Sequence, residues 1–195
     1  CAILQYGENK DILVTTDMLM EGVHFDLTYI PFKHLGYKAA MVNLSDIYAM
    51  GGSPKQMTVS VALSKRFGIE DMEDFYAGLR LACEAHGVDI IGGDTTSSRT
   101  GLAISITAIG EVEKESAIYR NGAKETDLIC VSGDLGAAYM GLQLLEREKD
   151  VYYKQIETAK TDIERMAISQ PDFSGREYLL ERQMKPEARR DILEQ

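Results

Sequence analysis

Three aspartates stand beside small or hydroxyl-bearing residues at the ends of apolar segments, where their carboxylates could bind a divalent cation. The contexts are Thr15-Thr16-Asp17, Asn43-Leu44-Ser45-Asp46 and Gly92-Gly93-Asp94-Thr95-Thr96. A carboxylate buried alone loses much of its solvation, and carboxylates that converge also repel one another. Mg²⁺ relieves both costs, because it binds one or two carboxylates together with waters and substrate phosphates. The pattern predicts a magnesium site if Asp17, Asp46 and Asp94 converge.

Each aspartate also has a structural interpretation, since Asp at the end of a strand or helix commonly caps a turn. Asp46 is the most informative, because Asn43 lies one helical turn before it in an otherwise apolar stretch, and both residue types are poor helix formers. Gly92 and Gly93 would let a ligand approach the backbone beside Asp94, but two glycines before an Asp are also an ordinary turn.

Three further features could bind an anion. The segment Ser132-Gly133-Asp134-Leu135-Gly136 precedes a predicted helix and could present free N–H groups. Arg120 could clamp a phosphate, and His24 lies in the glycine-containing stretch Gly22-Val23-His24-Phe25. Their structural alternatives are a strand-to-helix turn, a surface charge and a hydrogen-bonded structural histidine. The sequence contains no Gly-x-x-x-x-Gly-Lys-[Ser/Thr] loop, no Gly-x-Ser-x-Gly elbow and no His-Glu-x-x-His motif.

The elements that must position these residues alternate between strands and helices, which predicts an α/β or α+β fold. We expect strands over 2–4, 11–16, 57–63, 88–91, 102–113 and 127–131, and helices over 33–50, 70–86 and 137–148. Gly87 is the expected cap of the second helix. A boundary near 121–126 predicts a first domain over 1–123 and the beginning of a second α/β domain over 124–195, whose last part reads as charged helices broken at Pro171 and Pro186.

Composition limits the classes of function. The 195 residues carry a formal net charge of −10, which argues against non-specific nucleic-acid binding. Three cysteines without a Cys-x-x-Cys pair favour neither a disulfide framework nor a zinc site, and no apolar run approaches the length of a membrane span. We expect a cytoplasmic protein that binds no nucleic acid and no membrane.

Taken together, the motifs resemble those of the thiamine-monophosphate kinases, a family of the aminoimidazole-ribonucleotide-synthetase-like superfamily. The resemblance covers roughly residues 1–145, and its motifs occur in the family's order. The matching stretches are Thr15-Thr16-Asp17-Met18-Leu19-Met20-Glu21-Gly22-Val23-His24-Phe25, Asn43-Leu44-Ser45-Asp46-Ile47-Tyr48-Ala49-Met50-Gly51, Gly92-Gly93-Asp94-Thr95-Thr96 and Arg120-Asn121-Gly122-Ala123-Lys124.

The resemblance implies ATP-dependent phosphorylation of thiamine monophosphate to thiamine diphosphate, by direct γ-phosphoryl transfer without a covalent intermediate on the protein. It implies several Mg²⁺ ions on Thr15, Thr16, Asp17, Asp46 and Asp94. It also implies ATP contacts from Gly93, Asp94 and Arg120, and places His24 by the thiamine phosphate. The implied fold is a mixed β-sheet flanked by helices, like the N-terminal domain of aminoimidazole ribonucleotide synthetase. That sheet would pair with a second copy in a homodimer.

Two departures and two alternatives accompany this interpretation. The family's Gly-Asp-Asp motif would lie before residue 1, and the second domain would continue beyond residue 195, so we expect the segment alone to be inactive. Another ATP-dependent enzyme of the superfamily, selenophosphate synthetase-like or hydrogenase-maturation dehydratase-like, would show similar motifs. A nucleotide-binding dimerisation module without turnover is the alternative from another class.

Overall fold

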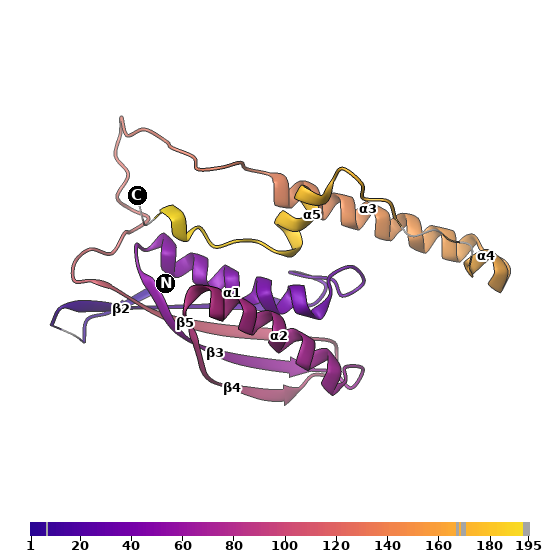
Figure 1. Ribbon diagram of the computed structural model, residues 1–195, viewed down its shortest axis with the longest axis horizontal. Helices are drawn as coiled ribbons and strands as arrows, with labels where there is room; N and C mark the ends of the chain where they lie inside the picture. Colours follow the sequence, from indigo (N-terminus) through magenta and orange to yellow (C-terminus); the bar gives the residue numbers. More distant parts are fainter. Residues whose placement is uncertain (7, 167, 169–170, 193–195) are drawn as a thin grey trace. The chain divides into compact units, whose positions relative to one another are not determined.

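The computed structural model describes the chain except for residues 7, 167, 169, 170 and 193–195 (Figure 1). The chain divides into two compact units. The first comprises Cys1–Cys130 and the C-terminal residues from Glu187 onward, and the second comprises Val131–Pro186. The expected boundary at residue 123 lies seven residues before the observed division at residue 130, and the return of the C-terminal residues to the first unit was not expected.

A five-stranded mixed sheet forms the base of the first unit. Its strand order is β1-β2-β5-β3-β4, with antiparallel neighbours except for the parallel pair of β3 and β4. The strands are β1 (Ala2–Leu4), β2 (Lys10–Met20), β3 (Ser53–Leu63), β4 (Asp89–Ser97) and β5 (Ala103–Glu113). The mixed sheet with helices confirms the predicted α/β class.

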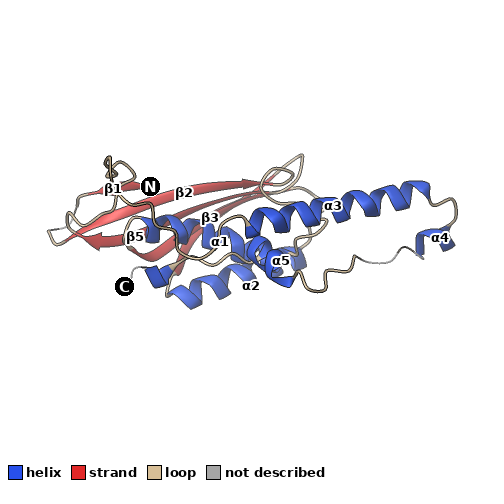
Figure 2. Cartoon of the chain, turned by 90° about the horizontal axis from the view of Figure 1, so that it is seen from above, coloured by secondary structure: helices blue, strands red, loops and turns tan. Residues whose placement is uncertain are grey.

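Two helices, α1 (Phe32–Ala49) and α2 (Ile69–His86), cover one face of this sheet (Figure 2). Side chains alternate between the two faces of a strand, and in β5 Ile104, Ile106 and Ala108 are fully buried beneath the helices. Within the described part of the first unit, no helix covers the opposite face. We call that opposite side the open face of the sheet.

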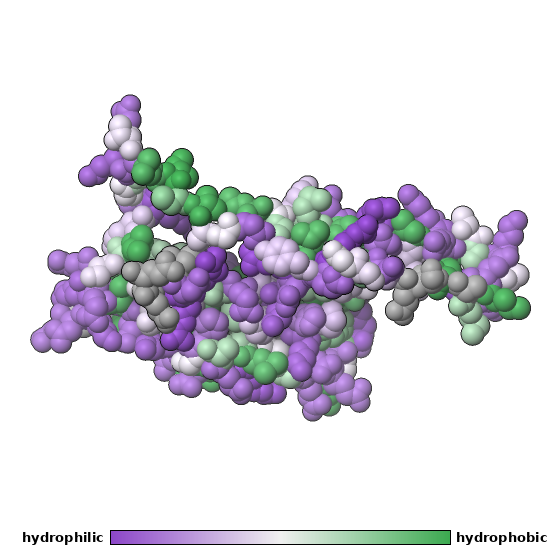
Figure 3. Space-filling view, turned by 45° about the horizontal axis from the view of Figure 1, so that its top comes forward, coloured by the Kyte–Doolittle hydropathy of each residue, from purple (hydrophilic) through white to green (hydrophobic). Residues whose placement is uncertain are grey.

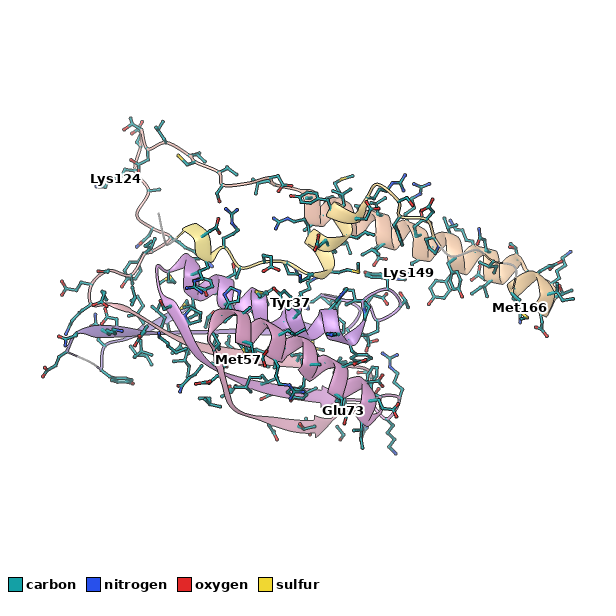
Figure 4. The ribbon with its side chains drawn as sticks, viewed as in Figure 1. Tyr37, Met57, Glu73, Lys124, Lys149 and Met166 are labelled. Carbon is teal, nitrogen blue, oxygen red and sulfur yellow. The ribbon has the colours of Figure 1, made fainter. Side chains whose placement is uncertain are left out.

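Local sequence signals explain both ends of α2. Asp71 accepts a hydrogen bond from the backbone N–H of Gly68 at 2.8 Å, which caps the first turn of α2. Gly87 ends that helix in the left-handed conformation with φ 64°, as predicted. Tyr37 on α1 donates a hydrogen bond to Glu187 at 2.8 Å and so contacts the C-terminal segment (Figure 4).

The second unit is helical in its described part. Its helices are α3 (Ala137–Thr158), α4 (Asp162–Met166) and α5 (Glu177–Met184), and α3 packs against α5. A short 3₁₀ helix, η1 (Arg190–Ile192), belongs to the first unit. No described helix is long and apolar enough to cross a membrane.

Several expectations about elements are wrong. The helix expected over 137–148 continues to Thr158, and the strand expected over 57–63 begins already at Ser53. The strand predicted to stop at Asp17 continues to Met20, and the strand predicted to break at Gly92 continues to Ser97. Both continue because the backbone of a polar residue pairs in a sheet as well as that of an apolar one. The strand expected over 127–131 is not formed. Leu128 and Ile129 are 89% and 97% exposed. Figure 3 shows that apolar (green) side chains lie at the surface of the chain.

Candidate functional site

The first predicted cluster forms between β2 and α1. Thr15 is buried beneath the helices and donates a hydrogen bond from its Oγ1 to Asp46 Oδ2 at 2.7 Å. Asp17 follows two residues later on the same strand, and therefore on the same face of the sheet. Asp46 lies in the last turn of α1. The tertiary fold thus brings together oxygen ligands that are 31 residues apart in the chain.

The charges of this cluster interact. Burial first, and the neighbouring carboxylate of Asp46 second, raise the pKa of Asp17, while the N-terminal amine and His24 act in the opposite direction. His24 therefore lies within electrostatic reach of Asp17. Two carboxylates that repel each other at a half-buried position are a site that a cation would stabilise.

A cavity of about 690 Å³ opens beside the cluster, within the size range of small-molecule sites. Asp46 contributes an acidic group to its wall and Arg120 a basic one. The remaining wall is largely apolar and includes Ala49, Met50, Ile118 and Tyr119. A carboxylate and a guanidinium in one cavity suit a ligand that carries phosphates together with an organic group.

Two predicted ligands lie on the open face instead. Asp94 pairs with Ser60, which pairs with Ser105, which pairs with Met18, so these four side chains share one side of the sheet. They also line a second, smaller cavity of about 150 Å³. Thr16 shares this face, where its Oγ1 accepts a hydrogen bond from Thr107 at 3.1 Å. Within one chain, Thr16 and Asp94 therefore do not converge with Asp17 and Asp46.

Gly93 has a packing role that the sequence did not reveal. A Cβ at this position would lie 1.8 Å from the carbonyl oxygen of Val59 on the neighbouring strand. A glycine is therefore required for β4 to pair with β3 at this point. Whether or not a ligand binds there, the backbone geometry explains the residue.

Two residues that line the large cavity, Ile118 and Tyr119, were not predicted as site residues. Both side chains are exposed. Shortly before them in the chain, the backbone N–H of Glu115 donates a hydrogen bond to Asp11, which is 2% exposed. The sequence signal that could have identified Tyr119 was its position directly before Arg120. The buried Oδ1 of Asn43 has no partner among the described residues, while its Nδ2 donates to Ala39 at 3.0 Å.

The donor set suits Mg²⁺ better than a thiol- or imidazole-binding metal. Asp17 and Asp46 offer two carboxylates and Thr15 a hydroxyl, and Mg²⁺ in proteins is usually bound by one or two carboxylates together with waters and substrate phosphates. Among the described residues, no group of three or more His, Cys, Asp or Glu side chains is arranged to hold a metal ion by itself. Substrate oxygens would be needed to complete such a site.

The fold and site define a class of protein. Residues 1–112 match the family described as AIR synthase related protein, N-terminal domain, and the chain belongs to this family.

Within that class, the curated relatives that the chain matches include thiamine-monophosphate kinases from several organisms, which confirms the resemblance drawn from the motifs. The protein from Bacillus subtilis is 39% identical over 146 residues, covering 75% of this chain and 45% of the relative. The protein from Aquifex aeolicus is 41% identical over 144 residues, covering 74% and 46%. The chain thus spans about half the length of the curated relatives it matches.

A solved structure described as AaThiL complexed with AMPPCP and TMP matches with a TM-score of 0.77 at 34% identity. The match covers 99% of this chain and 54% of that chain. The similarity therefore extends through both units of the chain described above.

Proposed function

We propose that the protein transfers the γ-phosphoryl group of ATP to thiamine monophosphate and forms thiamine diphosphate. The observation that carries the proposal is the cavity that combines Asp46 with Arg120 beside Asp17. The chain that forms it is 39% and 41% identical to two thiamine-monophosphate kinases over 75% and 74% of its length. The structure with AMPPCP, an ATP analogue, and TMP supports the same pair of substrates. No comparable observation favours selenide or another acceptor.

The chain's own residues would act mainly by positioning charged groups. Phosphoryl transfer requires alignment of the two substrates and neutralisation of the charge on the transferred group. Asp17, Asp46 and Thr15 would hold Mg²⁺, which supplies the positive charge that an acidic protein lacks. Arg120, which lines the same cavity as Asp46, would bind phosphate oxygens, and His24 would donate a hydrogen bond to the phosphate of thiamine monophosphate.

We also propose that two copies pair through their open faces. Met18 and Met20 on that face are 60% and 41% exposed, and burying such side chains would stabilise a dimer. In that arrangement Thr16, Gly93 and Asp94 would lie at or beside the interface. Their proposed roles toward metal and nucleotide therefore depend on the second copy, whereas those of Asp17 and Asp46 do not.

The compartment proposed is the cytoplasm, where ATP is available and thiols persist. Cys1, Cys83 and Cys130 are all free thiols in this structure, as is usual for proteins of a reducing compartment.

Because the segment alone is expected to be inactive, the decisive experiment uses the purified protein together with any sequence that flanks these 195 residues. It supplies Mg²⁺, ATP and thiamine monophosphate and measures thiamine diphosphate by chromatography. We expect turnover that Asp17→Asn and Arg120→Gln each reduce at least tenfold. Asp17→Asn removes a carboxylate proposed to hold Mg²⁺, and Arg120→Gln removes the positive charge proposed to bind phosphate oxygens. Lys10→Gln, at an exposed ion pair away from the cavity, is the matched control. Binding of ATP without any phosphorylated product would instead favour the nucleotide-binding module, and turnover only with selenide would favour a selenophosphate synthetase.

A further inference from the structure

Glu21 joins two loops at the end of the sheet where β2 finishes. Its Oε2 accepts a hydrogen bond from the backbone N–H of Leu102 at 2.9 Å, and its Oε1 forms an ion pair with Arg66. The backbone N–H of Glu21 also donates to the carbonyl of Leu102 at 3.0 Å. The side chain of Glu21 is only 19% exposed. Both carboxylate oxygens are therefore used, in a position largely shielded from water.

Arg66 also contacts an aromatic ring. Its guanidinium lies 4.5 Å from the centroid of the Phe67 ring, a cation–π distance. Phe67 in turn meets Phe32, the first residue of α1, edge to face at 5.5 Å between centroids. The contacts connect the end of β2, the loop before α2 and the beginning of α1.

The turn that follows Glu21 fixes the imidazole of His24. The backbone N–H of Met20 donates to Nδ1 of His24 at 3.0 Å, and the N–H of His24 donates back to the Met20 carbonyl at 2.9 Å. A neutral histidine that accepts at Nδ1 carries its proton on Nε2. His24 is exposed, so this Nε2–H is available to an anionic ligand. Phe25, which is 4% exposed, anchors the end of the turn.

We propose that Glu21 and Arg66 are positioning residues that hold this turn, so that His24 presents Nε2–H toward the phosphate of the substrate. The link to substrate rests on the proposed function, whereas the control of the imidazole by the pair does not. The pair acts through the turn, and neither residue needs to touch the ligand. An ion pair with an exposed partner contributes little to global stability, so its removal separates positioning from folding.

The test measures the imidazole nitrogens by NMR in the whole protein at a pH where histidine is neutral. The chain has three histidines, His24, His34 and His86, and His24→Gln identifies the signals of the first. We expect wild-type His24 to show the Nε2–H tautomer alone. Glu21→Gln and Arg66→Gln should each shift it toward a mixture of tautomers, while the signals of His34 and His86 stay unchanged.

Binding provides the second readout, with isothermal titration of thiamine monophosphate and of AMPPCP. We expect both variants to weaken thiamine monophosphate roughly tenfold and to leave AMPPCP unchanged, with Arg66→Lys restoring most of the affinity. Lys10→Gln, which breaks the 2.6 Å pair with Glu111 elsewhere on the sheet, should change neither the tautomer nor either affinity.

The two hypotheses can fail separately. An unchanged Nε2–H tautomer in both variants would overturn the positioning role, whatever the protein binds. A wild-type protein that binds no thiamine monophosphate, but whose His24 tautomer depends on Glu21 and Arg66, would refute the proposed substrate and support the positioning role. Equal weakening of both ligands with an unchanged tautomer would show that the pair supports the fold alone, and would also overturn the proposal.

Discussion

Replacing Asp46 with asparagine should move ligand binding and stability in opposite directions. In the protein without ligand, the Asp46 carboxylate raises the pKa of Asp17, which means that the two groups repel each other when both are charged. Asn keeps the size of Asp and retains an oxygen that can accept the hydrogen bond now made by Thr15 at 2.7 Å. The repulsion disappears while the hydrogen bond remains. We therefore expect the free energy of unfolding to stay constant or to rise by up to about 1 kcal/mol.

Binding of Mg²⁺ with nucleotide should suffer, because the charge that repels Asp17 is also the charge that attracts the cation. Loss of a charged partner costs about 1–3 kcal/mol, which is roughly a five- to 150-fold increase in Kd. At a ligand concentration of about 100 Kd, wild-type protein gains about 2.7 kcal/mol of stability from binding. A tenfold weaker variant gains about 1.4 kcal/mol at the same concentration.

Thermal melts measured with and without Mg²⁺ and AMPPCP separate these two effects. For a chain of this length, about 1 kcal/mol shifts Tm by roughly 2–4 °C. Without ligand, Asp46→Asn should melt at the wild-type temperature or slightly above it, and its ligand-induced shift should be about half as large. A lower Tm without ligand would show that Asp46 supports the fold. An unchanged ligand-induced shift would exclude Asp46 from the proposed metal site.

Three further predictions concern the packing around the site. Gly36→Ala would place a Cβ 1.9 Å from the Phe75 carbonyl oxygen. Although Ala has the better helix propensity, this clash should lower the free energy of unfolding, measured by denaturant titration, by about 1–3 kcal/mol. Burial raises the pKa of the Cys83 thiol to about 11, so at pH 8 a thiol reagent should label the two exposed cysteines and reach Cys83 only after unfolding. Burial lowers the pKa of His86, so the imidazole binds a proton more tightly in the unfolded chain than in the folded one. The free energy of unfolding should therefore fall as the pH falls below about 6.5. In thermal melts across about pH 5–8, His86→Gln should make Tm depend less on pH.

Helices were predictable because their signals are local. The apolar spacing of α1 and α2 and the cap at Gly87 depend on residues within a turn or two of each other, and the structure reproduces both helices to within one residue at each end. The ends of β2 and β4 were not predictable in this way. A polar residue such as Asp17 stops a strand only if its backbone lacks a partner, and here β5 pairs with β2 as far as Met20.

That error about strand ends also explains what was missed in the site. If Asp17 closed a strand, Thr15, Thr16 and Asp17 could all turn toward one ligand. In a continuous strand they alternate, so Thr15 and Asp17 face α1 while Thr16 faces away. The same rule, carried across β3 and β5 by the register of the sheet, puts Asp94 on the side of Thr16.

Because the acidic residues are divided between the two faces of the sheet, it can be tested which of them bind the proposed cation within one chain and which require a second copy. Asp17 and Asp46 meet within one chain, so their effect on cation binding should persist when the protein is diluted to a monomer. Asp94 faces away from them, so any effect of Asp94→Asn on the same cation should require a second copy and vanish on dilution. Sedimentation velocity combined with Mg²⁺-dependent melts would measure both. If Asp94→Asn weakened Mg²⁺ binding equally in the monomer, one chain would have to bring the two faces to a common ligand, which the register of this sheet does not allow.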